Sequence, residues 1–98
     1  MGSGNVTFIN PALATIANVP IGSEVRIYDY NGAGNSLGDE LSGIESAVSN
    51  NYTYNHSGAT NTVYIQVMPV GFEEIGLVRT LTNQDQTFTL LLTIDNNA

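Results

Sequence analysis

The sequence contains no cysteine, and because its two basic residues other than histidine are Arg26 and Arg79, it contains no lysine either. Without cysteine the chain can form neither a disulfide bond nor a zinc-thiolate site, and it has no thiol nucleophile. Without lysine it cannot supply the amine of a Schiff base or of a phosphate-binding P-loop. These absences exclude several classes of covalent, metal-binding and nucleotide-binding chemistry.

Charge is also scarce, and it is mostly of one sign. Charged residues make up 11% of the chain, with nine acids against two arginines, for a net charge of -7 at pH 7. A negative chain repels the phosphates of nucleic acids and of anionic membrane surfaces. No apolar run approaches the roughly 20 residues that span a bilayer. We therefore expect neither a nucleic acid nor a membrane partner.

The chain is expected to form one domain. Its 98 residues suffice for a single core, and the N-terminus lacks the basic and apolar regions of a signal peptide. We expect residues 1–4 to be a flexible tail or a cloning remnant and residues 5–98 to be the domain.

Apolar and polar side chains alternate over short segments, as in strands with one buried face. The clearest segments are Glu24 to Tyr30, Asn61 to Met68 and Gln86 to Asp95. Their inward faces are predicted to hold Val25, Ile27 and Asp29, then Val63, Ile65 and Val67, and finally Phe88, Leu90, Leu92 and Ile94. Weaker strand patterns cover Val6 to Asn10, Ala12 to Asn18, Glu40 to Glu45, Tyr52 to His56 and Ile75 to Thr82.

Turn-forming residues separate these segments, as at Pro20 to Ser23, at Ser57-Gly58 and at Asn83 to Asp85. Short strands with this spacing indicate an all-β fold, a two-sheet antiparallel β-sandwich of about seven short strands. A helical turn within Asp39 to Ser49 is the one alternative, since three apolar residues there have helical spacing.

One loop resembles a calcium-binding loop in its spacing. Asp29, Asn31 and Glu40 occupy its positions 1, 3 and 12, where oxygen ligands are expected. Ala33 stands where a third ligand belongs, and strands flank the loop in place of helices. A glycine-rich and asparagine-rich hairpin connection is the favoured interpretation, and calcium is the alternative.

The sequence offers little for catalysis, and we expect no enzyme and no cofactor. His56 is the only histidine, and no nucleophile-elbow motif accompanies it, so a solvated loop residue is favoured over a catalytic one. Glu73 and Glu74 are adjacent and would point to opposite faces of a strand. A surface turn partnered by Arg79 is the favoured interpretation of this pair.

Tyrosines and sheet edges are the candidate contact surfaces. Tyr28 with Tyr30, and Tyr52 with Tyr54, form two stripes that could contact a protein or a sugar, or simply cover the sandwich edge. Because lysines that would protect edge strands are missing, we expect neighbouring chains to cover the edges. The best docking strand is Val6 to Ala17 with Pro11 as its hinge, and an ordinary first strand is the alternative. Its candidate contact residues are Val6, Phe8, Leu13 and Ile16.

The order of these segments resembles a known family. From Val19 the chain reads Val-Pro-Ile-Gly-Ser-Glu-Val-Arg-Ile-Tyr-Asp, followed later by Gly71-Phe-Glu-Glu74 and by a threonine-rich last strand from Gln86 to Thr93. This succession resembles the transthyretin-like, carboxypeptidase regulatory-like β-sandwich, and in particular the copies carried by tailed-phage virion proteins. The usual Asp-Gly before the aromatic strand is missing from Ser49 to Ser57.

The resemblance implies a non-enzymatic structural module of a phage head, tail or fibre. Its partners would be copies of itself or other virion proteins, and it would be located in a virion or at an extracellular surface. The alternative function is a carbohydrate-binding or adhesion module that recognises a glycan, with calcium as an optional aid.

Overall fold

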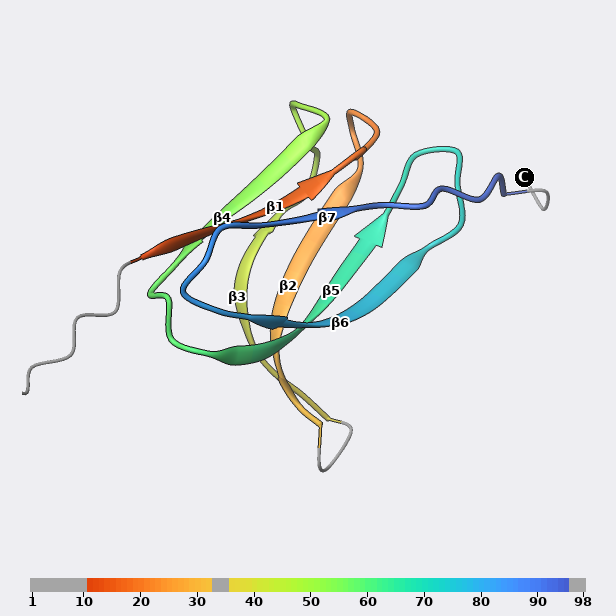
Figure 1. Ribbon diagram of the computed structural model, residues 1–98. Helices are drawn as coiled ribbons and strands as arrows, with labels where there is room; N and C mark the ends of the chain where they lie inside the picture. The colour runs from red at the N-terminus through yellow and green to blue at the C-terminus, as the bar shows by residue number, and fades with distance from the viewer. Residues whose placement is uncertain (1–10, 33–35, 96–98) are drawn as a thin grey trace, which may run out of the picture.

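The computed structural model describes residues 11–32 and 36–95, which fold into two stacked β-sheets (Figure 1). The three-stranded sheet has the order β4-β1-β7 and the four-stranded sheet the order β3-β2-β5-β6. The strands are β1 (Ala12–Ala17), β2 (Glu24–Asn31), β3 (Ser36–Ile44), β4 (Asn51–His56), β5 (Asn61–Met68), β6 (Ile75–Leu81) and β7 (Gln86–Thr89). The predicted all-β sandwich of about seven strands is confirmed. The helical turn considered at 39–49 is wrong, because β3 continues through Ile44.

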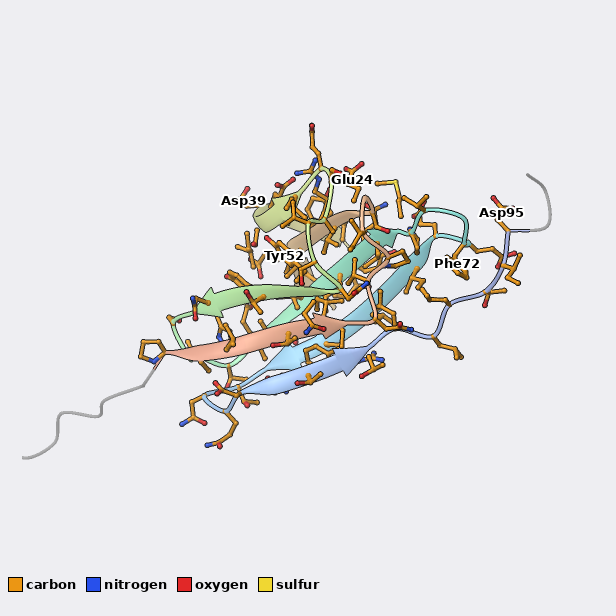
Figure 2. The ribbon with its side chains drawn as sticks, turned by 90° about the horizontal axis from the view of Figure 1, so that it is seen from above. Glu24, Asp39, Tyr52, Phe72 and Asp95 are labelled. Atoms are coloured by element: carbon orange, nitrogen blue, oxygen red, sulfur yellow. The ribbon has the colours of Figure 1, made fainter. Side chains whose placement is uncertain are left out.

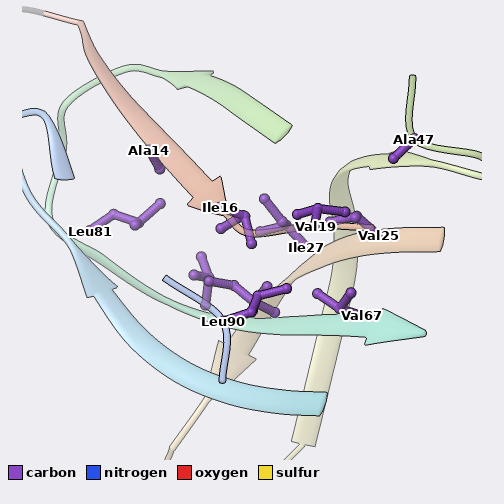
Figure 3. Packing of buried hydrophobic residues seen from close by; sticks show 11 residues of the cluster. Ala14, Ile16, Val19, Val25, Ile27, Ala47, Val67, Leu81 and Leu90 are labelled. Carbon is purple, nitrogen blue, oxygen red and sulfur yellow. The ribbon is translucent and has the colours of Figure 1, made fainter. Parts of the chain in front are cut away.

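The core lies between the two sheets, where the predicted alternation is largely confirmed (Figure 3). Two central strands of the four-stranded sheet contribute Val25 and Ile27 from β2, and Val63, Ile65 and Val67 from β5, each at most 1% exposed. The facing sheet contributes Ala14 and Ile16 from β1. The remaining residues of the core cluster lie outside strands or at the end of one: Val19, Ala47, Leu81 and Leu90. Burial of these apolar side chains supplies the main driving force for folding.

The last predicted strand differs from expectation. Regular pairing ends at Thr89, and β7 runs parallel to β1, whereas a wholly antiparallel sandwich was predicted. Parallel neighbours need a long crossover connection, and the chain between β1 and β7 provides one, since it includes all four strands of the other sheet. Leu90 is buried as predicted, but Ile94 is 65% exposed at an isolated bridge to Phe72. Asp29, placed on the inward side of β2, is exposed because it lies beyond the core.

The segment expected to dock on another chain is divided by the structure. Val6 to Asn10 lie outside the described residues. Ala12–Ala17 form β1, which pairs with β4 on one side and with β7 on the other. A central strand has no free edge, so this part of the predicted docking strand is an ordinary strand of the sandwich.

One buried serine joins three turns at the same end of the sandwich. Ser23 is 0% exposed and closes the predicted turn at 20–23, where its amide donates to the Pro20 carbonyl at 3.1 Å and Gly22 adopts a φ of 95°. Its carbonyl accepts from the Ala47 amide at 2.8 Å. Its Oγ accepts from the Val70 amide at 3.0 Å. Glycine is needed in this turn because other residues rarely adopt a positive φ.

We expect Ser23→Ala to lower the free energy of unfolding by about 1–3 kcal/mol, because it removes the acceptor for the Val70 amide. Urea denaturation followed by circular dichroism measures this change. Ser46→Ala, at an exposed position of the nearby loop, is the matched control and should change stability by no more than about 0.5 kcal/mol. Equal effects of the two substitutions would contradict the role assigned to Ser23.

Candidate functional site

Three tyrosines gather on the outer face of the four-stranded sheet. Tyr28 and Tyr30 lie on β2, on the side opposite the buried valine and isoleucine, as the alternation predicts. Tyr64 of β5 is paired with Tyr28 across the ladder. The rings of Tyr30 and Tyr64 have centroids 6.2 Å apart, within the range of an aromatic pair. The sequence shows Tyr64 on the polar side of its strand, but only the β2–β5 register brings it beside the other two.

At the borders of this outer face, two glycines leave space that neighbouring side chains occupy. A Cβ at Gly76 of β6 would collide with the Tyr64 hydroxyl, so the phenol ring lies over the glycine. A Cβ at Gly43 of β3 would lie 2.8 Å from Cδ of Arg26. Arg26 donates to Glu24 at 2.9 Å and to Glu40 at 3.3 Å, and the hydrogen bond to Glu24 is the largest cause of its raised pKa. This face, which we call the tyrosine platform, therefore combines aromatic and polar side chains.

Tyr52 and Tyr54 do not belong to this platform, although all four tyrosines were candidate contact residues. Both side chains pack against the core from β4. Tyr52 is labelled in Figure 2. The Tyr52 hydroxyl hydrogen-bonds the Ser42 hydroxyl of β3, which links the two sheets. Burial, reinforced by the negative charge of Asp29 and by Tyr52, raises the pKa of Tyr54 above its usual value. The two tyrosine stripes thus lie in different layers.

The raised pKa of Tyr54 predicts a loss of stability in alkali. The folded state holds the Tyr54 proton more tightly than the unfolded state. This contribution is therefore complete below the unfolded pKa near 10 and is lost as the pH rises through the folded pKa. We expect Tyr54→Phe to weaken the decline of the urea midpoint above about pH 10. Parallel declines in the variant and the original protein would contradict this assignment.

The predicted calcium ligands are not brought together. Asp29 lies on the inward side of β2, where Gly38 packs against its Cβ. The Glu40 carboxylate lies over the outer face, where it accepts from Arg26. Asn31, at the end of β2, precedes residues 33–35, which lie outside the described part of the chain. Among the described residues no group of three or more acids or histidines is arranged to hold a metal ion.

His56 lies at the end of β4 and is not the solvated loop residue that was expected. Its Nδ1 accepts from the Gly58 amide at 3.2 Å, and its Nε2 is buried without a partner among the described residues. A half-open pocket of about 460 Å³ adjoins it, lined by neutral side chains that include Tyr54, Thr60 and Leu81. Among the described residues that line this pocket there is no carboxylate and no second histidine to complete an acid-base pair.

Glu73, Glu74 and Arg79 do not form the predicted surface pair. Glu74 accepts from the Gln66 side chain at 3.1 Å. Arg79 instead donates to the Val78 carbonyl at 2.8 Å and lies over the Phe88 ring, 5.9 Å from its centroid. The ion pairs found among the described residues all belong to Arg26.

Part of the outer edge of β6 is capped by the protein's own side chains. Besides the Arg79 bond to Val78, the side-chain amide of Gln86 donates to the Thr80 carbonyl at 3.2 Å. The oxygen of the same amide accepts from the Thr82 backbone at 3.0 Å. Gln86 therefore satisfies two backbone groups that would otherwise face outward, as a neighbouring strand would do.

Two further edge strands are protected by their shape. In β3 the ladder to β2 is interrupted by two shifts of register, on either side of Tyr28. Such bulges increase the local twist of an edge strand and so make it a poorer partner for another strand. β7 is four residues long, so its regular edge is short.

The β4 edge has neither bulges nor the shortness of β7, and one side-chain cap is found on it among the described residues. Its six residues pair with β1 without a shift of register, and they include no proline and no charged residue other than the histidine at the end. The Leu13 amide donates to the Asp85 carboxylate, and the Ala17 carbonyl accepts from the Leu90 amide. The backbone groups of the odd-numbered residues of β1 therefore point toward β7. The backbone groups of the even-numbered residues of β1 point toward β4, where they pair with Tyr52, Tyr54 and His56.

By the same alternation, the backbone groups of Asn51, Thr53 and Asn55 point out of the sheet. The Asn51 amide donates to the Ser49 Oγ at 3.3 Å. For the Thr53 and Asn55 backbones no partner is found among the described residues. A row of outward amides and carbonyls is a template for another strand.

The structure also separates the candidate contact residues of β1. Leu13 is half-buried on the outer face of the three-stranded sheet, where a partner could reach it. Ile16 is 0% exposed in the core, so it cannot contact another chain while the sandwich is intact. Val6 and Phe8 lie outside the described residues.

Comparison with known proteins adds no relative. No family model, curated protein or solved structure matches the chain. The resemblance to transthyretin-like modules therefore remains a prediction. The described part of the chain contains no helix long and apolar enough to cross a membrane.

Proposed function

We propose that the protein is a non-enzymatic structural module that assembles through the edge of β4. The observation that carries this proposal is the contrast between this edge and the other three. The chain protects β3, β6 and β7 by bulges, by side-chain caps or by shortness. It leaves the longest regular uncharged edge, β4, with outward backbone groups. Unmet hydrogen bonds of this kind attract a strand from another chain.

The setting that we propose is a virion. This part of the proposal draws on the resemblance to modules of tailed-phage virion proteins, in which the partners are further copies or other virion proteins. Edge pairing suits a particle because each contact repeats the same strand geometry in every subunit. The chain is rich in neutral polar residues, and charged residues make up only 11% of it.

We expect Thr53→Pro to abolish assembly, because proline removes an outward amide and places a ring on the open edge. Analytical ultracentrifugation over a wide range of concentrations measures the oligomer. Thr53 makes no amide bond to β1, so the sheet should be retained, which circular dichroism checks. Val78→Pro is the matched control, because the Val78 backbone faces outward on β6, where side chains already cap the carbonyls of Val78 and Thr80.

In this experiment the original protein and Val78→Pro should form the same oligomer, and Thr53→Pro should sediment as a monomer. An original protein that stays monomeric at the highest concentration would overturn the proposal of self-assembly. An oligomer that survives Thr53→Pro would overturn the assignment of assembly to β4.

A carbohydrate-binding or adhesion function is the second candidate, and the tyrosine platform favours it. Tyr28, Tyr30 and Tyr64 present aromatic rings on one outer face, beside the polar groups of Thr62 and Gln66. Aromatic faces stack on sugar rings while neighbouring polar groups can bond the hydroxyls. The platform and the β4 edge belong to different sheets, so the two functions can be tested separately.

For this second function we expect the purified protein to bind members of a glycan array and Tyr64→Ala to weaken that binding about tenfold, from the loss of one aromatic contact. Thr87→Ala on the other sheet is the control and should bind as the original protein does. No binding to any glycan at millimolar concentration would count against an adhesion role.

A further inference from the structure

The strand at the open edge has a symmetrical sequence. Its first five residues read Asn51-Tyr-Thr-Tyr-Asn55, which is the same in both directions about Thr53. In an antiparallel pair formed by two copies of one strand, a two-fold axis places each residue opposite its mirror position. An axis through Thr53 would set threonine against threonine, asparagine against asparagine, and tyrosine against tyrosine.

The backbone groups of β4 that point outward are the ones that such an axis requires. Outward groups belong to Asn51, Thr53 and Asn55, the odd positions of the strand. Thr53 would therefore meet Thr53 of a second copy as a hydrogen-bonded pair, in which each amide donates to the other carbonyl. Asn51 would pair with Asn55 of the second copy in the same way. Its amide would exchange the 3.3 Å bond to the Ser49 hydroxyl for a backbone carbonyl.

The side chains at this edge suit a second copy. Thr53 points to the outer face, where it is exposed, as are both asparagines. Threonine and asparagine can hydrogen-bond their own kind across two strands, and such cross-strand pairs stabilise a sheet. On the other face, Tyr52 would lie opposite Tyr54 of the second copy, which is a favourable aromatic pair.

Charge also selects this edge. Two copies with a net charge of -7 each repel one another, so their contact has to keep acids apart. β4 contains no acid, whereas β3 carries Asp39 and Glu40 and Asp85 directly precedes β7. Paired through β4, two copies would place no carboxylate of one strand opposite a carboxylate of the other.

We infer that β4 pairs with β4 of a second copy of the chain, antiparallel and about a two-fold axis through Thr53. The two three-stranded sheets then form one continuous sheet in the order β7-β1-β4-β4-β1-β7. This inference rests on the proposed function and adds to it the partner, the symmetry and the register of the contact.

A charge exchange at the axis tests the inference. In Thr53→Lys two ammonium groups would face each other, and in Thr53→Glu two carboxylates would, so each variant alone should raise the dimer dissociation constant at least about fivefold. An equimolar mixture of the two variants should restore dimerisation, because lysine then faces glutamate. Sedimentation velocity measures all three samples.

Thr87→Lys is the matched control. Thr87, Thr15 and Thr53 lie in one row across the same outer face, with Thr87 on the opposite border of the sheet. This variant makes the same change in net charge as Thr53→Lys but places it away from the proposed axis. It should dimerise as the original protein does, or somewhat more tightly because the net negative charge is reduced.

A disulfide provides an independent measure of the register. The chain has no cysteine, so Thr53→Cys introduces a single thiol that can pair only with a second copy. Hydrogen-bonded residues in an antiparallel pair have Cα atoms about 5.5 Å apart, within the range of a disulfide. Oxidation should give a covalent dimer from Thr53→Cys and not from Thr87→Cys.

The outcomes separate this inference from the proposed function. An oligomer that is lost in Thr53→Pro, yet shows neither rescue in the mixed charge variants nor the Thr53→Cys crosslink, would overturn the two-fold register and leave assembly through β4 in place. Pairing of β4 with a strand of another kind would produce this pattern. A protein that is monomeric throughout would overturn both.

Discussion

Every backbone amide and carbonyl at the border of a sheet needs a partner, and the surface of this protein is organised around that requirement. A sandwich of two open sheets has four such borders, and this chain treats them unequally. The side-chain amide of Gln86 acts as a substitute strand beside β6. Bulges interrupt β3, and shortness limits β7. The remaining border, along β4, is the only one of the four where the described residues offer a straight, uncharged row of hydrogen-bonding groups.

Much of the fold could be predicted from the sequence because alternation is a local property. Val25, Ile27, Val63, Ile65 and Val67 are buried as their spacing indicates, since a side chain on every second residue of a strand faces the same way. The turn at 20–23 could likewise be read from its proline and glycine. Failures occurred where distant segments decide the outcome. The parallel pairing of β7 and the exposure of Ile94 depend on where the chain crosses between sheets, which no local pattern specifies.

The candidate sites were harder to predict than the core for the same reason. The spacing of Tyr52 and Tyr54 matches that of Tyr28 and Tyr30, yet one pair faces the interior and the other faces outward, because a period of two does not say which face is buried. The general lack of lysine directed attention to the edges as candidate contact surfaces. It could not identify which edge lacks a cap, because Gln86 and Arg79 replace lysine by reaching backbone groups of β6. The symmetry of 51–55 was readable in the sequence, but it gained meaning only once β4 was known to lie at a border.

The position of β1 has a consequence for how the protein is made. This strand, the first of the seven described, is flanked by β4 and by β7, and β7 is made after the other six. The hairpin pairs β2–β3 and β5–β6 join neighbours in the chain and can form early, whereas the three-stranded sheet has to wait for contacts between remote segments. Until β7 arrives, the nascent chain presents one side of β1 as a vacancy that any strand of another nascent chain could fill. A nascent chain is therefore most exposed to misassembly in the interval before β7 has been made and has paired with β1.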